Sequence, residues 1–140
     1  MNNELNKSDA IREIVDNFYS KAINDVFIGY HFRKVSSSSG SIVQSIEDFK
    51  AHLPKIYMFW EVQFGLKRQE KTKSLQLFAV HDNLHLRQGE IGRWIFLFKE
   101  TLEDFRAEYS PLCSKSKEFL KNWESKLAIF QSTFMKRYAK

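Results

Sequence analysis

The stretch IGRWIFLFKETLEDF, residues 91–105, decides the fold, because its apolar residues recur every three or four positions. A second stretch, FLKNWESKLAIFQSTF, residues 119–134, repeats this spacing. The stripe positions are Ile91, Trp94, Ile95, Phe98, Leu102 and Phe105 in the first stretch, and Phe119, Leu120, Trp123, Leu127, Phe130 and Phe134 in the second. This period is that of an amphipathic helix, so we expect two long helices with one buried face each.

Two further stripes lie in the N-terminal half of the chain. Their members are Ile11, Ile14, Val15, Phe18 and Ala22 in the first, and Ile46, Phe49, Leu53, Ile56 and Trp60 in the second. Ser8 or Asp9 is the expected N-cap of the first helix. Pro54 interrupts the second stripe, and proline is tolerated only in the first turn of a helix. The main helix there is therefore expected to start near Ala51 or to bend at Pro54.

Loop signals are few in this chain. Residues 36–40 are four serines and a glycine, and residues 65–76 are polar and basic with little period, so both are predicted loops. Only two prolines and five glycines occur among 140 residues, which favours long helices over many short strands. We expect one all-α domain over residues 1–140, with residues 1–8 flexible.

The net charge of +5 and the pI of about 9.3 leave nucleic acid, anionic membranes and anionic ligands open as partners. The basic residues are interspersed with acidic ones on predicted helices, which indicates solvated faces, so neither nucleic acid nor a membrane is an expected partner. Cys113 is the single cysteine, and no run approaches the roughly 18 apolar residues of a membrane span. With a polar N-terminus, these features predict a cytoplasmic protein.

Four histidines are the candidate metal ligands: His31, His52, His81 and His85. His81 and His85 are four residues apart and can share a helix face, but two ligands are too few for a zinc site. No nucleophile elbow and no phosphate-binding loop accompanies them. The surroundings are apolar and aromatic, with tyrosine, histidine and tryptophan as hydrogen-bond donors, which is the side-chain set of a haem pocket.

Four blocks of residues carry a family resemblance. They are Phe18-Tyr19, then Ile28-Gly29-Tyr30-His31-Phe32, then His52 with Ile56 and Phe59-Trp60, and finally His81-x-x-Leu84 with Arg93-Trp94-x-x-Leu97-Phe98-x-x-Thr101. In this order and spacing, over roughly residues 8–135, the chain resembles the truncated haemoglobins, most of all the third of their three groups.

The resemblance implies a two-on-two helical sandwich that encloses haem b. It implies His81 as the proximal iron ligand, with His85 as the alternative. The distal residues that would stabilise a bound gas are Tyr19, His52 and Trp94, and the residues that would line the cofactor are Phe32, Ile56, Trp60 and Phe98. The implied function is binding of O2, and of NO and CO as further ligands, at a pentacoordinate or weakly hexacoordinate iron. NO dioxygenation or peroxide chemistry, served by a reductase, is a further expectation.

The chain departs from the family between Trp60 and Trp94. The basic stretch from Lys67 to Lys73 stands where the family has a turn with glycine, tyrosine and proline, and the proline-rich segment after the proximal histidine is missing. A helical interaction module that kept the globin shape without the cofactor is therefore the second hypothesis. A nucleic-acid binder, suggested only by the charge, is the third.

Overall fold

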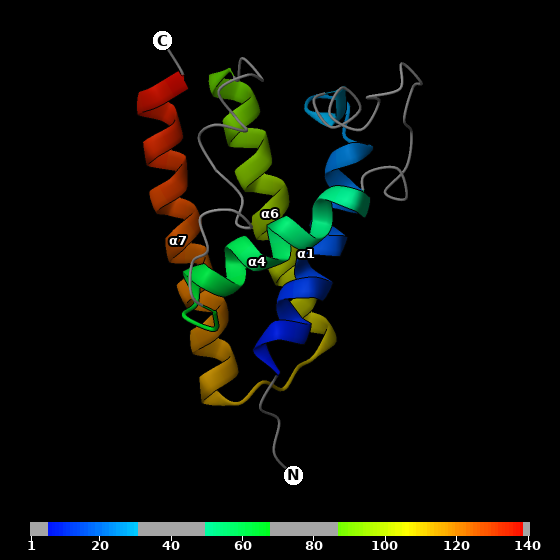
Figure 1. Ribbon diagram of the computed structural model, residues 1–140, viewed down its shortest axis with the longest axis vertical. Coiled ribbons are helices and arrows are strands. Elements are labelled where there is room, and N and C mark those ends of the chain that lie inside the picture. The colour runs from blue at the N-terminus through cyan, green and yellow to red at the C-terminus, as the bar shows by residue number, and fades with distance from the viewer. Residues whose placement is uncertain (1–5, 31–49, 68–86, 139–140) are drawn as a thin grey trace.

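The computed structural model describes residues 6–30, 50–67 and 87–138 (Figure 1). Its elements are α1 (Lys7–Ile23), the short 3-10 helix η1 (Lys50–His52), α4 (Leu53–Gln63), α6 (Gln88–Glu108) and α7 (Ser114–Tyr138). No strand occurs within these three ranges, so the prediction of an all-α protein is confirmed. The predicted loop at 36–40, most of the one at 65–76, and the stripe residues Ile46 and Phe49 lie outside the described residues.

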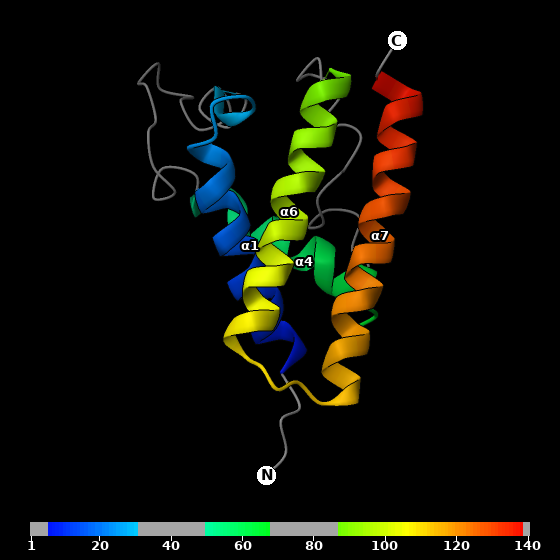
Figure 2. The ribbon, with the colours of Figure 1, turned by 180° about the vertical axis from the view of Figure 1, so that it is seen from behind.

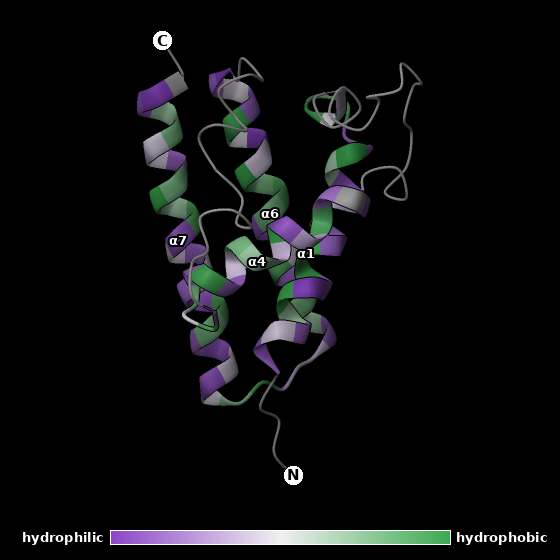
Figure 3. Cartoon of the chain, viewed as in Figure 1, coloured by the Kyte–Doolittle hydropathy of each residue, from purple (hydrophilic) through white to green (hydrophobic). Residues whose placement is uncertain are grey.

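The long helices lie side by side and the shorter one crosses them. α6 and α7 run antiparallel, α1 packs along α6, and α4 lies across α1 on the side that faces the viewer in Figure 1. The reverse view in Figure 2 has α1, α6 and α7 in front and α4 behind them. Each helix carries hydrophobic and hydrophilic residues in alternation along its turns (Figure 3). This pattern leaves one face of each helix for packing against its neighbours.

α1 begins earlier than the sequence predicts. Its N-cap is Asn6, whose side-chain oxygen accepts the Asp9 N–H at 3.0 Å, so the expectation of Ser8 or Asp9 as the cap is wrong. Asparagine caps helices as well as serine or aspartate does. The Ser8 hydroxyl is instead used between helices, where it donates to the buried Glu61 carboxylate of α4 at 3.1 Å.

Proline and glycine mark the two ends of α4. Pro54 lies in its first turn, where proline is tolerated, so the helix starts within a few residues of the expected position. Gly65 follows the last turn with a φ of +72°, a left-handed conformation that costs glycine little. The Leu66 N–H donates to the Glu61 carbonyl at 2.8 Å, which satisfies a carbonyl that the helix end would leave open.

Aromatic rings from the four described α-helices meet in the core. Phe18 of α1 stacks on Phe98 of α6 with ring centroids 4.4 Å apart. Trp60 of α4 lies 5.5 Å from Phe98 and 4.9 Å from Trp123 of α7. Aromatic side chains bury about 150–250 Å² each, so at ~25 cal/mol per Å² this cluster is a large part of the hydrophobic stabilisation.

A salt bridge joins the end of α1 to α6. The Asp25 carboxylate accepts the N–H groups of Phe27 and Ile28 at 3.0 and 3.2 Å, and it accepts Arg93 Nε at 2.9 Å. Burial alone would raise the pKa of Asp25, but the hydrogen bonds from Arg93 and from the two backbone N–H groups outweigh it, so the pKa is lowered. The ionised carboxylate therefore holds the turn after α1 against the first turns of α6.

Substitutions of Trp123 test how much the aromatic core stabilises the fold. Its side chain is fully buried, and its indole N–H has no hydrogen-bond partner among the residues that the structure describes. Trp123→Ala should lower the free energy of unfolding by about 3–5 kcal/mol. Trp123→Phe should lose less than half of that, because it keeps a ring and removes an N–H whose unmet bond costs about 1–3 kcal/mol. Ile129→Ala, on the exposed side of α7, is the control, and denaturant unfolding measures all three. Equal losses for the two Trp123 variants would contradict this account.

Asp25 tests the salt bridge. Asp25→Asn should lower the melting temperature at pH 7, because the neutral amide keeps the backbone bonds but loses the charge that faces Arg93. Since the folded pKa lies below the ordinary value of 3.8, the benefit of the wild-type carboxylate is present above that pH and is lost as the pH falls through the folded pKa. The melting temperatures of the wild type and of Asp25→Asn should therefore become equal in strong acid. Asp104→Asn, an exposed partner of Lys21, should have a smaller effect at pH 7.

Candidate functional site

Two of the three predicted distal residues meet at one aromatic ring. Tyr19 of α1 packs edge-on against Phe18 with ring centroids 4.8 Å apart, and Trp94 of α6 lies 6.5 Å from the same ring. Trp94 also packs against Phe134 of α7 at 5.5 Å. The structure thus brings a phenol and an indole, 75 positions apart in sequence, to the ring of Phe18.

The third distal residue, His52, ends η1 immediately before α4 and is half-buried. Two contacts give the direction in which α4 crosses α1: Glu61 accepts the Ser8 hydroxyl, and the Tyr57 hydroxyl donates to Asp16. Residues nearer the N-terminus of α4 therefore contact residues nearer the C-terminus of α1. This direction places His52 on the side of Asp16 where Tyr19 lies.

Both titratable members of this set are neutral at pH 7. Part of the Tyr19 side chain reaches the surface, but its hydroxyl is buried, and burial raises the pKa of that phenol well above its ordinary value of 10. Burial, together with the positive charge of Lys55, lowers the pKa of His52 below 6.5. A protonated phenol, a neutral imidazole and an indole each present an N–H or O–H donor.

The residues predicted to line a cofactor are divided between the core and undescribed parts of the chain. Ile56, Trp60 and Phe98 are buried, and the last two contact each other and Trp123, so protein atoms cover those ring faces. Phe32, His81 and the alternative ligand His85 lie outside the described residues. Within the ranges that are described, no three histidine, cysteine, aspartate or glutamate side chains gather as a metal site.

Two neighbours of the site were not singled out from the sequence. Phe134 belongs to a predicted stripe, but helical spacing alone does not reveal that it packs on Trp94. Asp25 was missed altogether, because its partner Arg93 is 68 positions away and the pairing depends on the fold. The N–H groups that Asp25 accepts from Phe27 and Ile28 form a local turn typical of aspartate, and that was the available signal.

No protein family, curated protein or solved structure matches this chain. The chemistry of the side chains is therefore the basis for assigning a function. Among the described residues, no helix is both long and apolar enough to cross a membrane.

The environment of His52 can be tested by titration. Lys55→Gln should raise the pKa of His52, because it removes a positive charge that disfavours the imidazolium, while burial keeps the pKa below 6.5. Proton NMR of the imidazole, assigned with His52→Asn, measures it. Lys99→Gln, on the exposed face of α6, is the control and should leave the pKa unchanged. With a folded pKa below 6.5, His52 costs stability as the pH falls through 6.5. If the pKa of His52 does not rise in Lys55→Gln, Lys55 does not act on His52 as described here.

Proposed function

We propose that this chain is a haem-binding protein of the truncated-globin type that binds O2, with NO and CO as further ligands, at an iron held by His81. His85 is the alternative ligand. The observation that carries the proposal is the meeting of Tyr19 and Trp94 at the ring of Phe18. His52, the third donor, stands at the start of α4, the end of that helix that is directed toward the C-terminal half of α1.

The helix arrangement supports the two-on-two sandwich that is part of this proposal. α1 and α4 form one crossing pair, and α6 and α7 form an antiparallel pair, while α1 also packs on α6. In this proposal the distal donors come from the α1–α4 pair and from the start of α6. A short α4 that begins at Pro54 leaves His52 at a helix start rather than within a helix.

The donor set fits the needs of a bound diatomic gas. The iron of haem, when bound, supplies a centre that takes O2 and gives it partial negative charge. Tyr19, His52 and Trp94 can each donate a hydrogen bond to such a ligand, and a bond to a charged acceptor contributes about 1.5–3 kcal/mol. Because Tyr19 and His52 are neutral at pH 7, they donate without bringing a buried charge.

Several donors on one ligand imply slow release. Each 1.4 kcal/mol of added stabilisation corresponds to a tenfold change in an equilibrium constant, so two or three donors hold a gas far more tightly than transport requires. Slow release suits removal of NO or peroxide, with a reductase that supplies electrons, and we include this in the proposal.

One observation favours a second function, that of a haem-free helical interaction module. Trp60, Phe98 and Trp123 are in ring contact with one another and Phe18 stacks on Phe98, so protein side chains fill this part of the interior. A globin shape that has lost its cofactor would close its cavity in this manner.

Hemin binding separates the two functions. The purified protein should give a strong Soret band with added hemin, and its melting temperature should rise, because a ligand at 100 times its Kd stabilises by about 2.7 kcal/mol. His81→Ala should remove most of the band, whereas His85→Ala should retain it if His81 is the ligand. Loss of the band in His85→Ala alone would assign the iron to the alternative histidine. Protein that neither develops the band nor gains stability would overturn the haem proposal in favour of the interaction module.

A further inference from the structure

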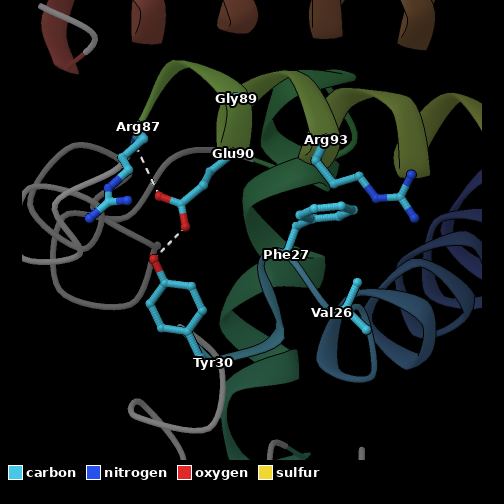
Figure 4. A pocket seen from close by; sticks show the side chains of 7 residues that line it. All are labelled: Val26, Phe27, Tyr30, Arg87, Gly89, Glu90 and Arg93. Carbon is cyan, nitrogen blue, oxygen red and sulfur yellow. Dashed lines mark hydrogen bonds between the residues drawn. The ribbon is translucent and has the colours of Figure 1, made fainter.

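The start of α6 presents its side chains to two sides of the helix. On the outer side, Arg87, Gly89 and Glu90 line a groove together with residues that follow α1 (Figure 4). Trp94 does not line this groove, and its indole packs instead on rings of α1 and α7. The distal donor that α6 supplies therefore belongs to the packed side of the helix, and its neighbours there decide how the indole lies.

Phe18 and Phe98 form one contact surface for Trp94. These two rings are stacked on each other at 4.4 Å, and the Trp94 ring meets both of them edge-on, with centroids 6.5 and 6.4 Å away. Aromatic pairs prefer centroid distances of about 4.5–7 Å, so both edge-on contacts lie near the far limit of that range. These two contacts by themselves therefore hold the plane of the indole only loosely.

Phe134 supplies a closer contact from α7. Its ring centroid lies 5.5 Å from that of Trp94, with 59° between the ring planes. Within the described ranges, Phe134 has no ring contact with Phe18 or Phe98, so it meets the indole at a place that the stacked pair does not cover. Phe134 is almost fully buried on a helix that packs against α6, whereas Trp94 is half-buried. Buried side chains are close-packed in single rotamers, so Phe134 is a fixed neighbour for the indole.

The plane of an indole decides where its N–H points. The nitrogen is part of the ring system and its hydrogen lies in the ring plane, so any rotation of the ring changes the direction of this donor. A hydrogen bond weakens steeply when its angle falls below about 120°. A residue that fixes the plane of the Trp94 indole therefore also decides how well this donor serves a gas bound beside it.

We infer that Phe134 positions Trp94, and that α7 in this way controls how the indole N–H is presented at the proposed gas site. The inference rests on the proposed function, because Trp94 is one of the three donors of that site. Phe134 lies four positions, about one turn, before the last residue of α7. A displacement of the last turns of α7 would therefore rotate the indole and change the rate at which O2 is released.

The first test follows the indole in hemin-free protein. Phe134→Leu removes the neighbouring ring and keeps an apolar side chain in the core, and it should shift the indole N–H signal of Trp94 in the NMR spectrum, assigned with Trp94→Phe. Phe130→Leu is the matched control, because it is the same substitution one turn earlier on α7, at a ring that packs against Phe59 and Trp60. It should shift the indole signal of Trp60 and leave that of Trp94 unchanged.

The second test measures O2 release from the hemin-loaded, reduced protein by stopped flow. Phe134→Leu should accelerate release by about threefold or more, since a misdirected donor stabilises the bound ligand less, and Phe130→Leu should not. In a Trp94→Phe background, which lacks the indole N–H, Phe134→Leu should have no further effect. Phe134→Met also lacks a ring but fills irregular space in a core, so it should behave like Phe134→Leu with the fold retained.

An unchanged Trp94 signal in both Phe134 variants would overturn the inference, and so would an equal shift of that signal in Phe130→Leu. Acceleration of the same size in the Trp94→Phe background would show that Phe134 acts by another route, which would also overturn it. Protein that takes up no hemin would end the proposed function instead, while the indole signals would still decide whether Phe134 positions Trp94.

Discussion

The stacked contact between Phe18 and Phe98 is the interaction on which the rest of the structure depends. The rings lie 4.4 Å apart with an angle of 26° between their planes, and both are almost fully buried. This contact fixes how α6 is rotated against α1, because a ring on each helix can stack in only one rotational setting. Trp60 and Trp123 then bring α4 and α7 onto the same ring of α6. Phe98 thus joins α6 to each of the other three α-helices that the structure describes.

The rotation of α6 against α1 also decides where the side chains at the start of α6 lie. Trp94 lies four positions before Phe98, about one helical turn, and so occupies the same side of the helix, toward α1 and α7. Arg93 precedes Trp94 by one position and reaches the turn after α1, where its guanidinium donates a hydrogen bond to the Asp25 carboxylate. One turn of α6 therefore carries both a predicted distal residue, Trp94, and the arginine that pairs with the turn after α1.

Helical spacing predicted the buried face of α6 well and its exceptions less well. Ile91, Ile95, Phe98, Leu102 and Phe105 are buried as expected, whereas Trp94 is only partly buried. Thr101 is buried too. Its hydroxyl donates to the Leu97 carbonyl at 2.8 Å, so the hydroxyl keeps a hydrogen bond away from water. A polar residue of this kind looks like a surface position in the sequence. Spacing reveals which face is buried, but it does not reveal which neighbour covers that face.

The site was predictable to the same extent. Tyr19 and Trp94 were singled out together, and the fold places them at one ring, since Trp94 belongs to a stripe that faces the core and Tyr19 follows the stripe residue Phe18. The aromatic contacts of Trp60 and the pairing of Asp25 with Arg93 depend on how helices cross, which local periodicity does not contain. The arrangement of Arg93 and Trp94 has a thermodynamic consequence. Consecutive residues of one turn face two different surroundings: Arg93 pairs with the buried Asp25, and Trp94 packs against the ring of Phe18. The contributions of these two contacts to stability are therefore coupled through the turn, and removing either one changes the free energy that the other contributes by the same amount.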